Sequence, residues 1–540
     1  MRREGQVPWP VDVAADYVWK GYWRQEVLGV LPARWAARHG GRVALVDGAV
    51  EVTYAELAAA VDSVAAQLLA SGLRDGDNVL LQLPNRWEFV PVLLGCARIG
   101  VAPVMVLPAY REYEVSYLAR AAEAAAIIVP GTFRGFDFRS MATRLASTMD
   151  IGCQVLVVGE DIVPDRRWQG PVTAPAPDPE DVAVLLLSGG TTGGLPKLIS
   201  RSHNDYEYNF RRSGEVCGFS ADTVYLVVLP MGHNFALGSP GLLGTLAVGG
   251  KVVLLPTPEP EAAFAAIARH RVNTVAVVPA VAQRWLESFD PGRHDVSSVA
   301  LVQVGGARCP AEVAGRIVDQ FRSTVQQVYG MAEGLLNFTR PDDPLDVVTA
   351  TQGRPISEDD EIRIVDPDGN PCEQGELLTR GPYTPRGYFR GGAHNEHGFT
   401  ADGWYRTGDV VRVHPSGNLV VEGRTKDLIN RAGEKIAALE IEDLAHVLPQ
   451  VVAAAAIPVP DPVTGERLCL CVVLRPGARL ELAELREVLL GKGIARFKVP
   501  ERLVVLDELP LTPVGKPDKK RLQEMVATPP SSPGERKGRQ

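Results

Sequence analysis

The first part of the chain alternates strand-like and helix-like patterns of apolar residues. Thr53-x-x-Glu56 has the spacing of a capping box, and the apolar residues from Leu57 to Leu69 then follow a helical period. Strands are predicted at 78–83, 101–107 and 126–129, with helices at 88–99 and 112–125. Because strands that alternate with helices favour βαβ crossovers, an α/β fold with mostly parallel sheets is expected.

A proline-rich segment, Pro171–Pro179, follows, and we interpret it as a surface connector between two lobes. After it, strand-like and helix-like patterns alternate again. The apolar run Val182–Leu187 predicts a strand that is buried on both faces of a parallel sheet. Further strands are expected at 224–229, 251–255, 274–278, 299–303 and 325–329.

The pattern changes near residue 361. Short strands at 361–365, 375–380, 410–413 and 418–422, with a turn at Pro415-Ser416-Gly417, predict a small β-rich subdomain. Beyond it, helices at 440–448 and 482–490 and strands at 451–457, 468–474 and 502–506 predict a separate α+β domain. We therefore expect an N-terminal domain at 1–425, a mobile C-terminal domain at 426–526 and a disordered tail at 527–540.

Composition narrows the possible partners. The 540 residues carry a formal net charge of −9, which argues against general nucleic-acid binding. No apolar run reaches the roughly 18 residues of a membrane span, and the N-terminus lacks the apolar stretch of a signal peptide. The seven cysteines are scattered, and Cys469-x-Cys471 lies in a strand-like run where both thiols are expected to be buried, so a reducing, cytoplasmic location is expected.

The strongest chemical signal is the segment Ser188–Lys197, which follows the apolar run Val182–Leu187. Its glycines free backbone N–H groups to face a ligand, its hydroxyls add donors, and its lysine adds a cation, a combination typical of phosphate binding. A Walker-type loop is excluded, because Leu195-Pro196 separates Gly194 from Lys197 and no hydroxyl residue follows the lysine. The alternative is a polar loop between a strand and a helix.

This loop resembles the signature loop of the adenylate-forming enzymes, which activate carboxylic acids with ATP. Other stretches match that superfamily in its usual order: Tyr329–Gly334 after a strand, Trp404–Asp409 before a strand, Gly423–Asp427 as a hinge, Gly433–Ile436, and Leu511–Lys516. A narrower resemblance, to the aryl-acid AMP ligases of siderophore and related peptide pathways, lies in Gly21–Trp23, Ser200–Tyr206, Pro230–Phe235 and Ala332–Arg340. The resemblance implies doubly wound βαβ lobes and a small β subdomain, hinged to a smaller α+β domain.

The resemblance also implies roles for individual residues. The phosphates of ATP would be held by Ser188, Gly189, Gly190, Thr191, Thr192, Gly193 and Lys197. Glu333 would bind Mg²⁺, with Thr192 close to the same phosphates. The adenine would lie between Gly305-Gly306-Ala307 and Tyr329-Gly330, and the ribose would be held by Asp409 and Arg424. Lys516 would bridge the acid and the α-phosphate, and the C-terminal domain would rotate at Lys426 between two half-reactions.

The acid pocket implied by the resemblance contains His203, His233, Asn234, Phe235, Ser239 and Leu336. An asparagine can hydrogen-bond an ortho hydroxyl while the ring packs on apolar walls. In the family, serine at position 239 goes with 2,3-dihydroxybenzoate, whereas leucine at position 336 goes with salicylate. Gly238 is also smaller than expected. This mixed pattern predicts a 2-hydroxybenzoate-type acid and leaves salicylate, 2,3-dihydroxybenzoate and a substituted relative as alternatives.

The sequence therefore predicts a stand-alone aryl-acid adenylating enzyme that uses ATP and Mg²⁺ and loads the phosphopantetheine arm of an aryl carrier protein. An aryl-CoA ligase is the first alternative, and an inactive homologue acting as a scaffold is the second. Intact Lys516, Glu333 and Asp409 disfavour the scaffold, and the His233-Asn234 match disfavours a luciferase-like oxygenase.

Overall fold

The computed structural model describes residues 4–149, 152–188, 196–425, 428–431, 434–461, 465–491, 494, 498–512 and 515–527. The described residues separate into two compact units. The first contains most residues up to 421, and the second contains residues from 422 onward together with the short segment around Asp409. Gly189–Gly193, Lys426, Gly433 and nearly all of the predicted tail lie outside the described residues.

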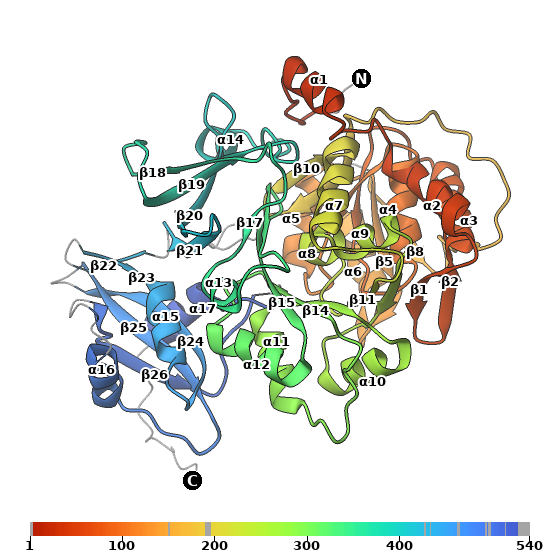
Figure 1. Cartoon of the computed structure of the whole chain (residues 1–540). Helices are drawn as coiled ribbons and strands as arrows, with labels where there is room; N and C mark the ends of the chain where they lie inside the picture. The colour runs from red at the N-terminus through yellow and green to blue at the C-terminus, as the bar shows by residue number, and fades with distance from the viewer. Residues whose placement is uncertain are drawn as a thin grey trace, which may run out of the picture. The chain divides into compact units, whose positions relative to one another are not determined.

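A nine-stranded sheet forms the centre of the first unit (Figure 1). Its order is β17 (Arg354–Pro355), β16 (Gly334–Phe338), β15 (Thr324–Met331), β14 (Leu301–Gly305), β13 (Thr274–Val277), β11 (Val224–Val227), β12 (Lys251–Leu254), β1 (Val43–Asp47) and β2 (Val50–Thr53). The strands from β15 to β1 are parallel, and β16, β17 and β2 add antiparallel edges. The mostly parallel α/β expectation is confirmed.

A six-stranded sheet is the second layer of the same unit. Its order is β10 (Leu198–Ser202), β9 (Val182–Leu187), β4 (Ala102–Met105), β3 (Asn78–Leu81), β5 (Ala126–Pro130) and β8 (Gln154–Val158). The strand Val182–Leu187 is buried as expected, but it has β4 as a parallel neighbour and β10 as an antiparallel one. The segment Pro171–Pro179 leads from β8 to β9 of this one sheet, so its interpretation as a connector between lobes is wrong.

Helices pack on both sheets. They are α1 (Val11–Trp19), α2 (Leu31–His39), α3 (Tyr54–Ala70), α4 (Phe89–Arg98), α5 (Glu112–Ala121), α6 (Phe138–Ser147), α7 (His203–Val216), α8 (Asn234–Gly238), α9 (Gly241–Ala247), α10 (Pro260–His270), α11 (Pro279–Ser288), α12 (Ala311–Phe321) and α13 (Leu345–Ala350). The predicted capping box starts α3: Thr53 N–H donates to Glu56 Oε2 over 2.8 Å, and Glu56 N–H donates to Thr53 Oγ1 over 3.2 Å. None of the helices in the described ranges has both the length and the apolar character that crossing a bilayer requires.

A four-stranded sheet holds the predicted β-rich segment: β18 (Glu361–Val365), β19 (Gln374–Arg380), β20 (Tyr405–Val413) and β21 (Leu419–Arg424), with α14 (Ala393–Gly398) between β19 and β20. The motif Trp404–Asp409 does not precede a strand, because Tyr405–Asp409 already form the first half of β20. Tyr329–Met331 likewise belong to β15 rather than following it.

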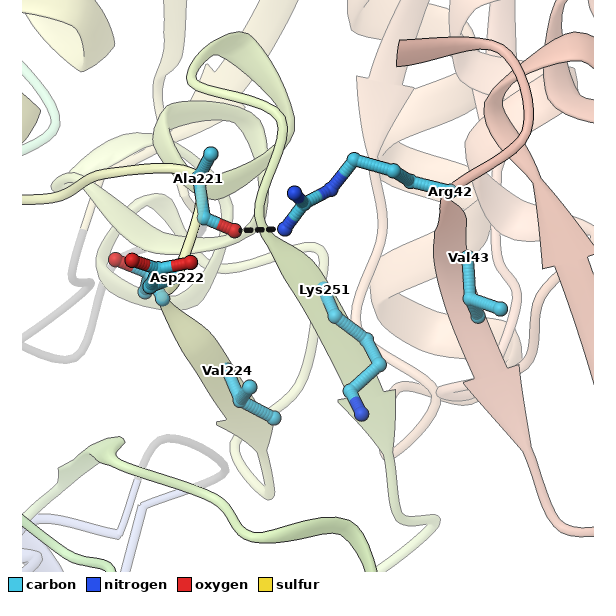
Figure 2. Close-up of a pocket in the computed structure, with 7 residues that line it drawn as sticks. Arg42, Val43, Ala221, Asp222, Val224 and Lys251 are labelled. Carbon is cyan, nitrogen blue, oxygen red and sulfur yellow. Dashed lines mark hydrogen bonds between the residues drawn. The ribbon is translucent and has the colours of Figure 1, made fainter.

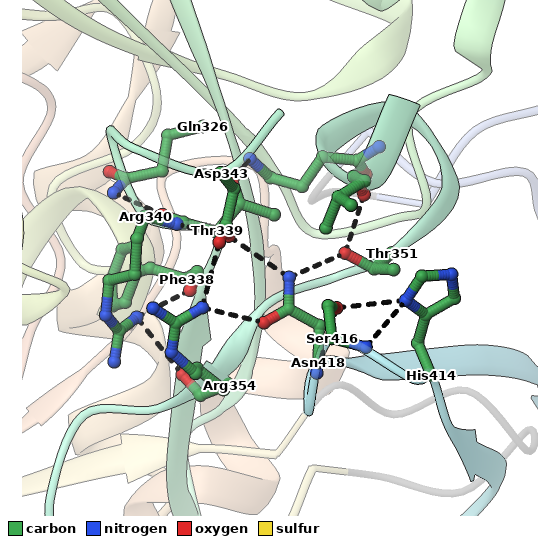
Figure 3. Close-up of polar contacts among 12 residues, drawn as sticks. Gln326, Phe338, Thr339, Arg340, Asp343, Thr351, Arg354, His414, Ser416 and Asn418 are labelled. Atoms are coloured by element: carbon green, nitrogen blue, oxygen red, sulfur yellow. Dashed lines mark hydrogen bonds and ion pairs between the residues drawn. The ribbon is translucent and has the colours of Figure 1, made fainter. Parts of the chain in front are cut away.

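A buried polar cluster joins the turn after β20 to the large sheet (Figure 3). Asn418 is fully buried, and its Nδ2 donates to Asp343 Oδ2 over 3.1 Å and to Thr351 Oγ1 over 3.0 Å. Arg354 Nη1 donates over 3.0 Å to Asn418 Oδ1 and to Asp343 Oδ1. Since every polar atom of the Asn418 amide is bonded, the cluster fixes the β20–β21 hairpin against the end of β16 and β17.

The second unit is α+β, as predicted. Its sheet contains β23 (Glu434–Ala437), β22 (Leu428–Arg431), β25 (Gly465–Leu474), β24 (Val451–Asp461) and β26 (Arg502–Leu506), with helices α15 (Ala438–His446), α16 (Leu482–Gly491) and α17 (Lys519–Ala527). All seven cysteines of the chain are free thiols. Cys469 and Cys471 are fully buried, as their alternation predicts, and Cys372 is the one cysteine that is not buried.

Candidate active site

Most of the predicted first-unit site residues lie at or near one edge of the nine-stranded sheet. Gly305 ends β14, Tyr329 and Gly330 lie in the last part of β15, and the segment His233–Ser239 follows β11. Parallel strands place their carboxyl ends at the same edge, where open α/β sheets usually bind ligands. The topology therefore gathers residues that are up to about a hundred positions apart in the chain.

Glu333 lies in the tight turn between β15 and β16, not at a helix start. Its side chain is buried, and burial raises the pKa of its carboxyl above the usual range. The hydroxyl of Tyr388 donates to Glu333 Oε1 over 3.2 Å and lies 3.2 Å from the Tyr405 hydroxyl. Lys197 Nζ lies 4.4 Å from the centroid of the Tyr388 ring, which attracts a cation. Tyr388 thus contacts both the predicted metal ligand and the predicted phosphate-binding lysine.

The strands on either side of the glycine- and hydroxyl-rich loop, β9 and β10, form an antiparallel pair. Ser188 N–H donates to the Lys197 carbonyl over 3.0 Å, and Lys197 N–H donates to Ser188 Oγ over 2.9 Å. The alternative of a polar loop between a strand and a helix is wrong, because an antiparallel strand follows the loop. Gly189, Gly190, Thr191, Thr192 and Gly193 lie outside the described residues, so their phosphate contacts stay predictions.

The predicted adenine wall adjoins the predicted acid pocket. A Cβ atom placed on Gly305 would lie 2.9 Å from Phe235 Cζ and 3.0 Å from Val328 Cβ, so this glycine makes room for the phenyl ring. Gly306 has a φ of +81°, a conformation that favours glycine, and Ala307 beyond it is exposed. Tyr329 lies opposite Asn337 in the β15–β16 pair and is half-buried.

Four predicted acid-binding residues, His233, Asn234, Phe235 and Ser239, lie in α8 or cap its ends. His233 caps this helix, with Nδ1 accepting from Phe235 N–H over 3.2 Å. Asn234 Nδ2 donates to Ser239 Oγ over 3.3 Å, and both side chains are buried. Leu336 is buried in β16, and its N–H donates to the Tyr383 hydroxyl over 3.0 Å. The result is a polar pair beside the Phe235 ring.

His203 is the first residue of α7 and has no exposed surface. Its Nδ1 accepts from Leu28 N–H over 3.1 Å, which ties α7 to the N-terminal segment. A role of His203 in admitting the acid stays a prediction.

Sequence reasoning missed a buried charged group beneath the acid pocket. Arg201, which is fully buried, donates to Asp205 Oδ1 over 2.6 Å, to Asn209 Oδ1 over 3.1 Å and to the Ala332 carbonyl over 3.1 Å. It also missed Tyr206, whose hydroxyl donates to Asn234 Oδ1 over 2.9 Å. The four-residue spacing of Arg201 and Asp205 was the available signal, since such a pair can neutralise itself at the start of a helix.

The second unit contains the remaining described site residues. Arg424 Nε donates to the buried Asp409 carboxylate over 2.9 Å, so the two predicted ribose-binding residues are in contact. Lys516 lies in a tight turn in which Thr512 N–H donates to the Lys516 carbonyl over 2.7 Å and Gly515 adopts a φ of +79°. Lys426 lies outside the described residues, so its hinge role stays a prediction.

One surface cavity of about 350 Å³ lies at the opposite, amino-terminal edge of the nine-stranded sheet (Figure 2). Arg42 and Val43 at β1, Asp222 and Val224 at β11, and Lys251 at β12 line it. The Arg42 guanidinium donates to the Ala221 carbonyl. None of the predicted site residues lines this cavity.

Comparison with known proteins agrees with this arrangement. Residues 32–389 match the model of the AMP-binding enzyme family, and residues 440–516 match that of the AMP-binding enzyme C-terminal domain. The chain is 53% identical to a salicylyl-CoA synthase / salicylate adenylyltransferase of a Streptomyces species, over 97% of this chain and 98% of the relative. It is 46% identical to the salicyl-AMP ligase / salicyl-S-ArCP synthetase of Mycobacterium tuberculosis, over 97% and 96%.

A solved structure shares the fold over most of the chain. The apo structure of Mycobacterium smegmatis MbtA is 44% identical, with a TM-score of 0.74, and the match covers 96% of this chain and 98% of that one. The two family models and these identities, each over more than nine-tenths of the chain, agree. The chain belongs to the AMP-binding enzyme family and, within it, to the group of aryl-acid AMP ligases.

Proposed function

We propose that this enzyme activates a 2-hydroxybenzoate-type acid with ATP and then transfers the aryl group to a thiol. The observation that carries the proposal is the buried Asn234–Ser239 pair beside Phe235, whose ring packs on Gly305. An aromatic acid fits apolar walls with a few fixed polar groups. Because Phe235 touches the predicted adenine wall, the acid and the nucleotide would bind side by side. The relatives named above act on salicylate, which supports the same class of acid.

In the first half-reaction, a carboxylate oxygen of the acid attacks the α-phosphorus of ATP. The bond between the α-phosphorus and the bridging oxygen to the β-phosphate breaks, which gives aryl-AMP and pyrophosphate. Both reactants are anionic, so the site has to neutralise charge and hold them in line. We assign Ser188, Lys197 and residues 189–193 to the leaving phosphates and Lys516 to the carboxylate and α-phosphate.

Glu333 fits a magnesium-binding role, because a buried carboxylate is a hard oxygen ligand and Tyr388 holds one of its oxygens. Mg²⁺ when bound would neutralise part of the triphosphate charge. Glu333 would orient toward the phosphates, with Thr192 close by, and Lys197 seated on Tyr388 would add a second positive charge. Asp409 would accept the ribose hydroxyls, and Arg424 beside it would hold that carboxylate in place.

In the second half-reaction, a thiol sulfur attacks the acyl carbon of aryl-AMP and AMP leaves. We propose a domain boundary at residues 425–426 and rotation at Lys426, so that Lys516 serves the first step and the segment containing Gly433 serves the second. The acceptor we favour is the phosphopantetheine arm of an aryl carrier protein, as the name of the M. tuberculosis relative indicates for that protein. Coenzyme A is a second candidate, favoured by the name of the Streptomyces relative.

ATP–pyrophosphate exchange tests the proposal. The panel contains salicylate, 2,3-dihydroxybenzoate, methylsalicylates, hydroxypicolinate and benzoate. We expect exchange with at least one 2-hydroxy acid and at least about tenfold weaker exchange with benzoate, because benzoate leaves buried donors unpaired. A protein that exchanges with none of these acids would contradict the proposal. A product assay with CoA and with a phosphopantetheinylated aryl carrier protein then decides the acceptor.

A further inference from the structure

Tyr206 is built into the floor of the proposed acid pocket. It lies on α7, is almost fully buried, and its hydroxyl donates to Asn234 Oδ1 over 2.9 Å. Burial raises the pKa of this phenol far above its usual value, so the hydroxyl keeps its hydrogen. In the described part of the chain, Asn234 Oδ1 is the acceptor bonded to that hydroxyl.

The contact with Tyr206 decides which way the Asn234 amide faces. With its oxygen on Tyr206, the amide must turn its nitrogen the other way, and Nδ2 indeed donates to Ser239 Oγ over 3.3 Å. An amide nitrogen carries two hydrogens, and Ser239 takes one of them. Because Ser239 Oγ accepts from Asn234, its own hydrogen also points elsewhere. The pair therefore presents hydrogen-bond donors.

Gly238 and Arg201 hold Tyr206 in this position. A Cβ atom on residue 238 would lie 2.8 Å from Tyr206 Oη and 2.9 Å from Cζ, so only glycine leaves room for the phenol. The Arg201 guanidinium carbon lies 5.0 Å from the centroid of the Tyr206 ring, and Asn209 links Arg201 to the Gly238 carbonyl. Gly238, which is smaller than the resemblance led us to expect, leaves the space that the Tyr206 phenol fills.

We propose that Tyr206, seated on Gly238, is a positioning residue that locks Asn234 as a donor and so selects acids with an acceptor atom ortho to the carboxylate. The inference rests on the proposed function. In a 2-hydroxy acid the hydroxyl hydrogen is held by the neighbouring carboxylate, which leaves the phenolic oxygen as an acceptor for Asn234. An aromatic acid with an amino group ortho to the carboxylate presents N–H groups instead, so that its N–H donors face the N–H donor of Asn234.

The test compares a 2-hydroxybenzoate with the matching 2-aminobenzoate. Both carry the further ring substituents that the wild-type enzyme accepts best. In wild type we expect kcat/KM in ATP–pyrophosphate exchange to favour the 2-hydroxy acid by at least about 100-fold, since mispaired buried groups are costly. Tyr206→Phe frees the Asn234 amide to reverse, so this ratio should fall by about tenfold or more. Activity with the unsubstituted acid should change far less than the ratio.

Tyr208→Phe is the matched control, because Tyr208 lies on the same helix, is equally buried and donates or accepts over 2.7 Å at Ser357 rather than at Asn234. It should leave the ratio as in wild type. Gly238→Ala keeps the Tyr206 hydroxyl but displaces the ring, and it should lower the ratio as Tyr206→Phe does. If Tyr206→Phe does not fold, Gly238→Ala tests the role of Tyr206 in its place.

The possible results distinguish the role of Tyr206 from aryl-acid adenylation itself. A folded Tyr206→Phe or Gly238→Ala enzyme with an unchanged ratio overturns the role of Tyr206, and so does an equal fall of the ratio in Tyr208→Phe. A wild-type enzyme that activates both acids equally well overturns the donor lock while leaving aryl-acid adenylation intact. A wild-type enzyme that activates no aryl acid removes the proposed function, and the inference falls with it.

Discussion

At the scale of single residues, the site depends on aromatic side chains that hold polar ones. Tyr388 is the clearest example, because its hydroxyl bonds Glu333 while its ring lies under the Lys197 ammonium. A carboxylate and a lysine that must both face phosphate would otherwise be free to pair with each other. The tyrosine contacts each of them through a different part of its side chain.

Tyr388→Phe should raise the Mg²⁺ concentration needed for half-maximal pyrophosphate exchange by about three- to tenfold, which corresponds to the loss of one hydrogen bond to a charged acceptor. The ring persists, so the contact with Lys197 should survive. A magnesium titration of the exchange rate measures the effect. Tyr54→Phe, which removes a buried hydroxyl bonded to the Gly250 carbonyl over 2.6 Å, is the control. An unchanged magnesium requirement in Tyr388→Phe would argue against this contact.

Asp360 should make stability depend on pH. Burial raises the pKa of its carboxyl to about 7, although the Tyr383 hydroxyl at 2.5 Å and Ser357 N–H at 3.1 Å favour the ionised form. The folded-state pKa lies above the unfolded one, so the stabilising contribution is complete below about pH 4 and is lost as the pH rises through 7. Between pH 5 and 8 the wild type should lose about 2 kcal/mol of unfolding free energy relative to Asp360→Asn.

Urea denaturation at the two pH values measures this difference, with the exposed Asp342→Asn as the control. If wild type and Asp360→Asn change in parallel between pH 5 and 8, the carboxyl is already ionised in the folded protein at pH 5. The residue is half-buried as a whole while its Oδ1 is buried, so we expect an effect smaller than that of a completely enclosed carboxyl.

At the scale of elements, the site depends on hairpins. The β9–β10 hairpin carries the phosphate loop, the β15–β16 turn carries Glu333, and the β20–β21 hairpin is tied to the large sheet by Asn418. Each hairpin places a loop at a defined sheet edge, and register in an antiparallel pair leaves little freedom in where that loop begins.

Asn418→Ala should lower the unfolding free energy by about 2–3 kcal/mol, because it leaves the buried Thr351 hydroxyl and its partners on Asp343 and Arg354 without their bonds. Ser416→Ala is a matched control in the same turn, since Ser416 is exposed, and should cost less than about 0.5 kcal/mol. Urea or thermal unfolding of both variants gives the comparison. Equal losses in the two would mean that the turn, not the buried cluster, carries the stability.

Most of the helices and strands could be predicted from the sequence, but not all of them. Apolar periodicity located most strands and helices, and the capping box at Thr53 was confirmed. Strand β10 was missed because Leu198–Ser202 is buried although it contains Arg201, whose charge Asp205 neutralises from the next helix. The four-residue spacing of this pair was the one sign of it in the sequence. Long-range hydrogen bonds such as Tyr206 to Asn234 have no periodic signature, so the floor of the acid pocket could not be predicted.

At the scale of the whole molecule, the proposed chemistry draws on both units. Glu333, Asn234 and Lys197 belong to the first, whereas Asp409, Arg424 and Lys516 belong to the second. The motifs predicted that Lys516 belongs to the C-terminal part, whereas the predicted N-terminal domain at 1–425 included Asp409 and Arg424, which group with the second unit. The loop residues 189–193 and Lys426 lie outside the described residues.

Lys516→Ala should reduce pyrophosphate exchange by at least about 100-fold, as expected when a charge that acts on the transition state is removed. Folding and ATP binding should change little, because the backbone of the turn holds its own hydrogen bonds to Thr512. Exchange kinetics and equilibrium ATP binding are measured on the same preparation. Lys519→Ala, which removes a nearby lysine paired with Glu442 over 2.8 Å, is the control. Unchanged exchange in Lys516→Ala would remove this lysine from the reaction.

Each of the two units contains buried cysteines whose alkylation can report when that unit opens. Cys372 is the one thiol that is not buried, whereas Cys96, Cys153, Cys217 and Cys309 are enclosed in the first unit and Cys469 and Cys471 in the second. Burial raises the pKa of Cys96 to about 12, so an alkylating reagent meets little thiolate there until the unit opens. Timed alkylation followed by peptide mass spectrometry would therefore record the opening of the two units separately, in the unmodified enzyme and during turnover.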